Sequence, residues 1–157
     1  MRHAIFDIET RIDKRLVNEN QFRGRGLSDE AAFEELRSEI LERRGTDFFP
    51  LSFHVPISIA VGSVEDHVLH TVEMLAAEDY SEERLVRVFW DRVERFKGCL
   101  VSFNGRQFDL PVLELQALRY GCAAPSYFGG DSSYRRRYQQ ALDATASFRT
   151  LLDDASG

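Results

Sequence analysis

Apolar and polar residues alternate one by one near the start of this chain. Phe6 and Ile8 alternate with Asp7 and Glu9, and alternate side chains of a β-strand point to opposite faces. The pattern predicts a strand that turns its apolar residues towards a core and both carboxylates towards the other face.

Helical spacing of apolar residues is clearest in two later segments, and Ser28 fits the N-cap of the first. The first runs from Ser28 to Gly45, with acidic residues in its first turn and arginines in its last. Both ends therefore suit the helix dipole. The second runs from Ser81 to residues 97–98 and carries its apolar residues on one face. The polar residues 18–26, which include an Arg-Gly-Arg-Gly run, predict a loop.

Two further strands are expected in the middle of the chain. Segments 55–61 and 67–72 are rich in apolar and β-branched residues, and the turn-like residues 62–66 lie between them. This arrangement predicts a β-hairpin. Near the end, the composition of residues 123–133 predicts an irregular segment, and residues 141–152 predict a last regular element.

A strand-to-helix junction is expected after residue 99. Residues 99–103 predict a short buried strand, and Asn104-Gly105 is a strong turn signal directly after it. Pro111 suits the first turn of a helix, where its missing N–H costs nothing. Asp109 is thereby expected at a helix N-terminus, where the dipole favours the ionised carboxylate.

The order of these elements predicts a mixed-sheet α/β domain. With 157 residues, the chain is expected to form one domain, residues 1–157. A net charge of −6 argues against a general nucleic-acid-coating protein. A nuclease remains compatible with this charge, because bound divalent ions supply positive charge locally. Cys99 and Cys122 show no metal-ligand spacing. The sequence has no apolar run typical of a secretory signal or of a membrane-spanning helix. We therefore expect a cytoplasmic protein without a membrane partner.

Three carboxylates from separate segments are the candidate chemistry. Asp7 and Glu9 share one strand face, and Asp109 begins a later helix. Oxygen ligands of this kind suit Mg²⁺ or Mn²⁺, which keep coordination positions for water and substrate phosphates. The set predicts hydrolysis of phosphodiester bonds.

Two motifs carry a resemblance to a known family. Residues 6–10, Phe-Asp-Ile-Glu-Thr, resemble the first motif of the DEDD 3′–5′ exonucleases, and residues 102–111, Ser-Phe-Asn-Gly-Arg-Gln-Phe-Asp-Leu-Pro, resemble the second. The Asn-x-x-x-Phe-Asp form is similar to the proofreading domain of family B DNA polymerases. It is more similar to small bacterial proteins described as predicted 3′–5′ exonucleases related to that domain. The resemblance implies a ribonuclease H-like fold, a mixed sheet flanked by helices.

The resemblance also implies a two-metal-ion mechanism. Two Mg²⁺ or Mn²⁺ ions would activate water and stabilise the leaving 3′ oxygen. The implied catalytic residues and metal ligands are Asp7, Glu9 and Asp109. The implied activity is exonucleolytic hydrolysis at the 3′ end of single-stranded nucleic acid, with DNA favoured over RNA, in proofreading or DNA repair. The identity of a polymerase or repair partner stays open.

Three further residues are implied in binding the terminal nucleotides: Thr10, Asn104 and Phe108. Two of them have an alternative interpretation. Phe108 is equally well explained as core beneath the site, and Asn104 as a residue that stabilises its own turn.

The chain departs from the family in its third motif, in which a tyrosine precedes the fourth acid by four residues on a late helix. Tyr127 and Asp131 have this spacing, but they lie in a glycine-rich stretch. Asp143 aligns better with an acid that precedes the missing motif. We therefore expect the chain to lack the last strand-helix portion of such a domain, and the fourth metal ligand stays open.

Two rival functions remain at this point. One is a catalytically deficient ribonuclease H-like module that binds nucleic acid or a partner, using the three arginines between Tyr134 and Tyr138. A solvated charged turn is the alternative interpretation of these arginines, and the favoured one. The other is a phosphatase-like enzyme with Asp7 as nucleophile. Glu9 and Thr10 stand where that chemistry usually has aspartate and glycine, which disfavours the phosphatase.

Overall fold

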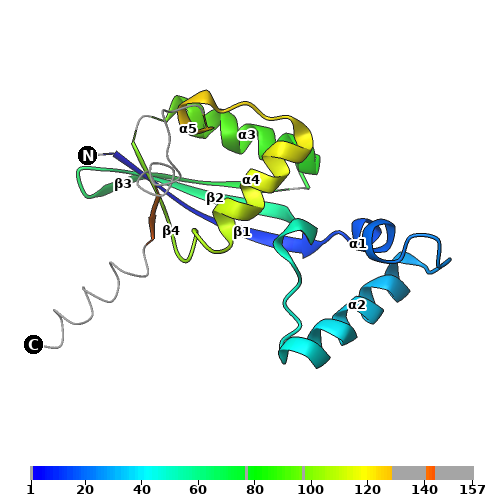
Figure 1. Cartoon of the computed structure of the whole chain (residues 1–157). Coiled ribbons are helices and arrows are strands. Elements are labelled where there is room, and N and C mark those ends of the chain that lie inside the picture. Colours follow the sequence, from blue (N-terminus) through cyan, green and yellow to red (C-terminus); the bar gives the residue numbers. More distant parts are fainter. Residues whose placement is uncertain (1, 77, 97, 129–140, 144–157) are drawn as a thin grey trace, which may run out of the picture. The chain divides into compact units, whose positions relative to one another are not determined.

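This protein contains a five-stranded sheet (Figure 1), and its computed structural model describes residues 2–76, 78–96, 98–128 and 141–143. The chain divides into two compact units. We call residues 1–9 and 56–157 the sheet unit, and residues 10–55 the helical insert. Each is described by itself.

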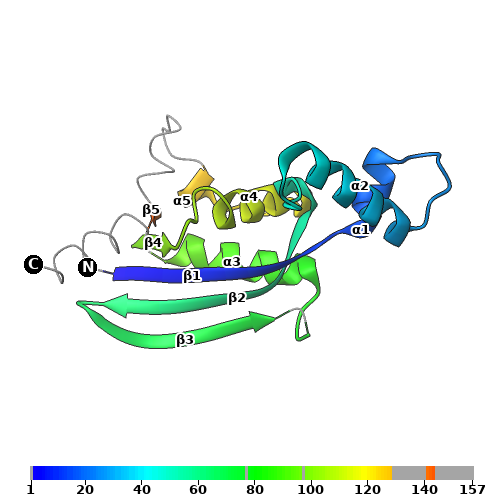
Figure 2. The ribbon, with the colours of Figure 1, turned by 90° about the horizontal axis from the view of Figure 1, so that it is seen from below.

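The sheet is mixed, as the sequence predicts. Its strands are β1 (Arg2–Ile12), β2 (His54–Glu65), β3 (Val68–Ala76), β4 (Cys99–Ser102) and β5 (Ala141–Asp143), in the order β3-β2-β1-β4-β5. β2 and β3 pair antiparallel, whereas β4 pairs parallel with both β1 and β5. Figure 2 shows that β1 and β2 run in opposite directions. The mixed sheet and its helices confirm the predicted mixed-sheet α/β class.

Two helices pack side by side on one face of the sheet (Figures 1 and 2), α3 (Glu82–Arg95) and α4 (Asp109–Tyr120). Ser81, from which the sequence predicts this helix to begin, caps α3 by accepting a hydrogen bond from the amide of Arg84 at 3.2 Å. The indole N–H of Trp90 donates to the carbonyl of Leu113 at 3.1 Å and joins the two helices. A one-turn helix, α5 (Pro125–Phe128), lies within the segment that the composition predicts to be irregular.

The predicted hairpin is present, but its turn lies later than the sequence indicates. β2 continues through Gly62 and ends at Glu65, so the turn consists of Asp66 and His67. Both turn residues have positive φ, 48° and 67°. A two-residue hairpin turn needs this conformation to match the right-handed twist of the two strands. The sequence predicts a turn at Gly62 because glycine has a low strand propensity. In the structure, Gly62 instead belongs to β2 and pairs with Val72 of β3.

The helical insert contains α1 (Lys14–Gln21), α2 (Asp29–Arg44) and the short 3₁₀ helix η1 (Leu51–Phe53). The ends of α2 confirm the prediction, because Ser28 accepts from the amide of Ala31 and Gly45 has φ of 68°. The prediction of a loop over residues 18–26 is wrong for its first half, which belongs to α1.

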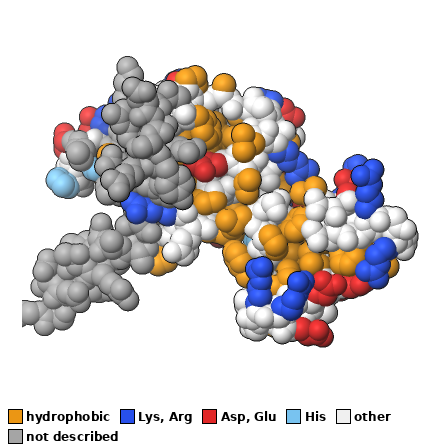
Figure 3. Space-filling model, viewed as in Figure 1, with side chains coloured by type: hydrophobic (Ala, Val, Ile, Leu, Met, Phe, Trp, Pro, Cys, Tyr) orange, Lys and Arg blue, Asp and Glu red, His pale blue; other side chains and the backbone are white. Residues whose placement is uncertain are grey.

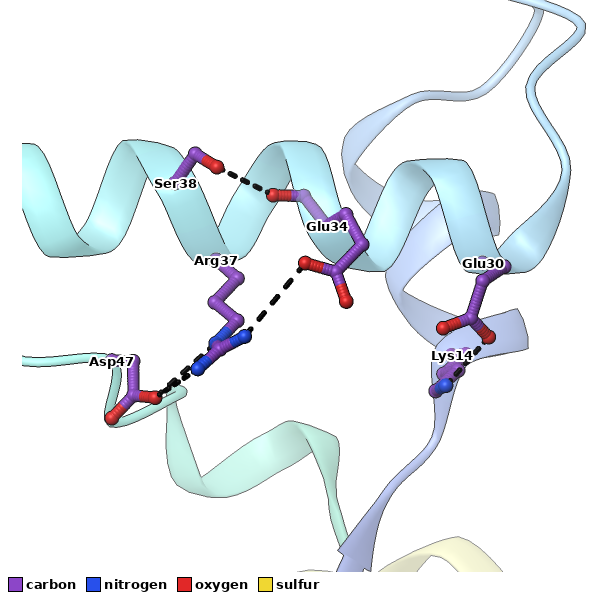
Figure 4. A network of polar contacts seen from close by, with 6 residues as sticks. All are labelled: Lys14, Glu30, Glu34, Arg37, Ser38 and Asp47. Atoms are coloured by element: carbon purple, nitrogen blue, oxygen red, sulfur yellow. Dashed lines mark hydrogen bonds and ion pairs between the residues drawn. The ribbon is translucent and has the colours of Figure 1, made fainter.

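The insert has its own apolar core. It is formed by buried residues of both helices and of the segment that leads to η1: Val17, Phe22, Ala32, Leu36, Ile40, Phe49 and Phe53. Ion pairs fix its outer side (Figure 4), where Lys14 lies 2.6 Å from Glu30 and Arg37 lies 2.9 Å from Asp47. Figure 3 shows basic and acidic side chains interspersed over α1 and α2. Among the described residues, no helix is both long and apolar enough to cross a membrane.

Candidate active site

β1 presents the first two predicted acids as the alternation predicts. Phe6 and Ile8 are buried, with 2% and 5% of their surface exposed, whereas Asp7 and Glu9 are exposed. The ring of Phe6 packs against Phe89 of α3 at a centroid distance of 5.3 Å. Burial of these apolar residues against the helices thus holds both carboxylates on the opposite side of the strand.

The second motif forms a tight connection between β4 and α4. Asn104 has φ of 55°, in the left-handed region that asparagine tolerates better than most residues. Its carbonyl accepts the amides of Gln107 at 3.0 Å and Phe108 at 3.3 Å. The turn predicted at this position is therefore present and is closed by the backbone of Asn104.

Gly105 is needed for the close packing of this connection. A Cβ atom added to it would lie 1.5 Å from the Oγ of Ser102, which is buried at the end of β4. The carbonyl of Gly105 accepts the amide of Leu110 at 2.8 Å. Packing of the turn onto the end of β4 thus sets where the first residue of α4 lies.

That first residue is Asp109, which is only 3% exposed. The pKa of its carboxyl group is raised to about 6, mainly by burial and also by the negative charges of Asp7 and Glu9. Hydrogen bonds from its own amide and from the amide of Ile8 act in the opposite direction. Since Ile8 lies between Asp7 and Glu9 in β1, the structure brings the three predicted carboxylates to one region.

The donor chemistry of these three residues fits Mg²⁺ or Mn²⁺, because all three supply carboxylate oxygens. In the part of the chain that the structure describes, however, no three His, Cys, Asp or Glu side chains are arranged to hold one ion. The side chains of Asp7 and Glu9 are exposed, whereas Asp109 is buried. The arrangement is thus a coupled carboxylate cluster rather than a preformed metal centre.

The three predicted nucleotide-binding residues have different surroundings. Asn104 is exposed at its turn, and Phe108 is half-buried at the N-cap of α4, where its carbonyl accepts the amide of Val112 at 3.0 Å. Thr10 belongs to the helical insert. Their contacts with nucleotides stay predictions.

His54 is a neighbour of Thr10 that the sequence gives no reason to select. Its Nδ1 lies 2.9 Å from the Oγ1 of Thr10, and its Nε2 lies 3.3 Å from the carbonyl of Phe49. Burial lowers the pKa of His54, so its ring is neutral at pH 7. A carbonyl only accepts, so Nε2 carries the proton and Thr10 donates its hydroxyl to Nδ1.

Of the three candidates for a third motif, Tyr127 and Asp143 belong to the described residues. Tyr127 packs on Trp90 at 4.9 Å between ring centroids and donates its hydroxyl to Glu114 at 2.9 Å, so it is part of the core. Asp131 and the arginines of residues 135–137 lie outside the described residues. Asp143 belongs to β5 and is the register partner of Ser102.

Comparison with known proteins identifies a family to which this chain is similar. A family model described as a predicted 3′–5′ exonuclease related to the exonuclease domain of PolB matches residues 46–149. This range includes Asp109 and begins after Asp7 and Glu9. No curated protein matches the sequence.

Two solved structures resemble the fold with low sequence identity. Escherichia coli exonuclease I, in complex with a dT13 oligonucleotide, is 13% identical over 95% of this chain and 29% of its own, with a TM-score of 0.48. The family B DNA polymerase of the hyperthermophilic archaeon Pyrobaculum calidifontis is 22% identical over 79% of this chain and 12% of its own, with a TM-score of 0.46. The chain thus spans less than a third of either protein. On the match of the family model, the chain belongs to the family of predicted 3′–5′ exonucleases related to the exonuclease domain of PolB.

Proposed function

We propose that this chain provides the catalytic carboxylates of a metal-dependent 3′–5′ exonuclease that shortens single-stranded nucleic acid, with DNA as its favoured substrate. Asp7, Glu9 and Asp109 are its proposed metal ligands, and Mg²⁺ or Mn²⁺ its proposed ions.

The observation that carries this proposal is the position of Asp109. It is a buried carboxyl group whose pKa is raised to about 6, with Asp7 and Glu9 close enough to contribute to that shift. Grouping carboxylates in this way is unfavourable for the protein alone, because like charges repel and burial removes water from them. A divalent cation would relieve both costs.

Each residue would then have a defined task. Asp7 and Glu9 are exposed and can approach an ion bound to substrate, while Asp109 is held by the Ile8 amide and by the start of α4. The dipole of α4 and the Ile8 amide favour the ionised form of Asp109 that metal binding requires. Bound Mg²⁺ or Mn²⁺ would supply a nucleophilic water and stabilise the charge on the leaving oxygen.

The direct experiment is digestion of single-stranded DNA labelled at its 5′ end, with Mn²⁺ added to the purified chain. We expect the products to shorten stepwise from the 3′ end. Asp7→Ala should lower the rate by at least about a hundredfold, because misplacement of reacting groups alone has a cost of that size. Electrophoresis of the labelled products at successive times gives both direction and rate.

Asp79→Ala is a matched control, because Asp79 is an exposed acid in the connection between β3 and α3. This variant should keep the wild-type rate. Degradation by Asp7→Ala at the rate of Asp79→Ala would show that the assigned site is wrong.

A second candidate is a module of the same fold that binds nucleic acid without cutting it. It is favoured by the finding that no three described side chains are already arranged around a metal position. Thermal unfolding in the presence of Mn²⁺ separates the two functions. An ion bound by the native state raises the unfolding temperature of the exonuclease, whereas an unchanged temperature together with retained oligonucleotide binding supports the module.

A further inference from the structure

A second concave site lies within the sheet unit, on the helix-covered side of the sheet. It is a pocket of about 390 Å³, within the size range of ligand-binding pockets. Ala4 and Phe6 of β1 line it, so it opens on the strand face opposite to the one that carries Asp7 and Glu9. The pocket is therefore separate from the proposed exonuclease site.

Apolar side chains form the floor of the pocket. They come from three strands and from α3: Ala4, Phe6, Val61, Phe89, Val93 and Leu100. Phe6 and Phe89 are each only 2% exposed and belong to the core. These six residues form a well-packed apolar surface that suits an aliphatic or aromatic group, and the hydroxyl-bearing residues Ser63 and Thr71 line the pocket beside it.

Positive charge borders this floor. Arg2, Arg92 and Arg95 line the pocket, and Glu73 is the single acid among the lining residues. Arg92 lies 2.6 Å from Glu73, which neutralises that pair. Two guanidinium groups therefore remain in excess at the border of the pocket, in a chain whose net charge is −6.

The two other arginines are only weakly engaged. Arg2 lies over the ring of Phe96 at 5.4 Å and is 3.9 Å from Glu65, a long contact between exposed groups. Arg95 donates its Nε–H to the carbonyl of Asp91 in its own helix at 3.0 Å. Both guanidinium groups keep further N–H donors for an incoming carboxylate.

From this combination we propose that the pocket is the docking site of an acidic peptide segment of a partner protein. One large apolar side chain of the segment enters the pocket, and carboxylates next to it in sequence bind Arg2 and Arg95. The charge excess favours an anionic partner, and the apolar floor requires that the partner also carry an apolar anchor.

A peptide fits this chemistry better than a nucleic acid does. A nucleobase on the apolar floor would leave most of its polar edges without a partner, which is unfavourable, because Ser63 and Thr71 are the only uncharged polar side chains among the described residues that line the pocket. The side chains of leucine and phenylalanine need no hydrogen-bond partner, and that of tryptophan needs only one, for its indole N–H. Single-stranded DNA serves as the rival ligand in the test.

The probe for this proposal is a short fluorescein-labelled peptide with one tryptophan flanked by aspartates, titrated with the intact chain and followed by fluorescence anisotropy. We expect binding in the micromolar range that weakens with added salt. Two control peptides separate the contributions, one with serine in place of tryptophan and one with asparagines in place of the aspartates. Each should bind at least about tenfold more weakly than the probe.

Two pairs of variants place the peptide in the pocket. Thr71→Trp fills the pocket from β3, whereas Val72→Trp adds the same side chain on the opposite face of that strand. Arg95→Glu reverses a charge at the border, and Arg84→Glu reverses one on the same helix outside the pocket. We expect the first variant of each pair to weaken binding at least about tenfold and the second to leave it unchanged.

Equal affinity within both pairs would overturn the proposal, as would equal affinity of the probe and its serine control. Displacement of the peptide by a short single-stranded oligonucleotide from the wild type but not from Arg95→Glu would also overturn it, because the pocket would then bind nucleic acid. Since Asp7 is not involved, Asp7→Ala should bind the peptide normally, which keeps this test independent of the proposed exonuclease activity.

Discussion

The carboxyl group of Asp109 has an ordinary pKa of 3.8 and a pKa of about 6 in the folded protein. Between these two values the native state binds more protons than the unfolded chain, so stability falls as the pH rises. The contribution of the protonated carboxyl group to stability is complete below about pH 4 and is lost once the pH passes about 6.

A substitution at this residue makes the effect measurable. Asp109→Asn keeps an oxygen that can accept the Ile8 amide but carries no charge at any pH. The metal-free variant should therefore unfold at a higher temperature than the wild type at pH 7, and this difference should shrink below pH 4. Thermal unfolding in the presence of a chelator, with Asp79→Asn as control, measures it.

The prediction fails if the metal-free wild type is at least as stable as Asp109→Asn at pH 7. In that case the carboxylates would be further apart, or better solvated, than the structure has them. Repulsion among the carboxylates of Asp7, Glu9 and Asp109 would then be too weak to support a cation site.

Sequence alone predicted the local features of the candidate site better than its long-range contacts. The exposure of Asp7 and Glu9 follows from alternation within one strand, and the place of Asp109 follows from the proline two residues later. The hydrogen bond between Thr10 and His54 has no such signal, because it joins residues 44 positions apart. Nor does alternation show that Asp109 lies against Ile8.

At the scale of elements, α1 is the clearest case that the sequence analysis missed. Asn18 and Asn20 have low helix propensity and favour a loop prediction. Asp13 outweighs them, because its side chain accepts the amide of Leu16 at 3.0 Å and caps the helix. Val17 also packs into the core of the insert and is fully buried.

The cap can be tested against a residue of the same helix. Asp13→Ala should lower the free energy of unfolding by about 1 kcal/mol, because an amide at the helix N-terminus loses its acceptor. Asn20→Ala, at an exposed position, should leave stability unchanged or raise it slightly, because alanine is the better helix former. Urea denaturation of both variants measures the difference, and an equal effect of the two substitutions would contradict the capping role.

Helices with strong signals at both ends were predicted nearly to the residue. Ser28 and Gly45 delimit α2, and Ser81 begins α3, because caps act through local hydrogen bonds that composition reveals. The hairpin turn was predicted too early in the sequence, because the glycine typical of a turn lies within β2 rather than in the turn itself. Pairing of β2 with β3 extends beyond the glycine that suggested a turn.

At the scale of the whole molecule, two units with separate interiors share one chain. Leu36 belongs to the core of the helical insert, whereas Leu113 is buried in the sheet unit. Each unit should therefore respond mainly to loss of its own packing. The expectation of a single domain stays a prediction about how these units behave together.

Cavity-forming substitutions test this separation. Leu36→Ala removes packing worth about 2–5 kcal/mol, and we expect faster amide hydrogen exchange in α1 and α2 with unchanged protection in α3 and α4. Leu113→Ala should produce the converse pattern. Uniform loss of protection in both units after either substitution would show that they open as one cooperative unit.

The parallel pairing of β1 with β4 has a consequence for how the protein reaches its active form. Register partners such as His3 and Cys99 are about a hundred residues apart in sequence, so their meeting requires closure of a long loop. The turn from β4 into α4, in contrast, is made of neighbouring residues and can form early. The acids of β1 would join Asp109 only when this distant pairing is complete, so the onset of the proposed nuclease activity during refolding would report the last stage of folding rather than the first.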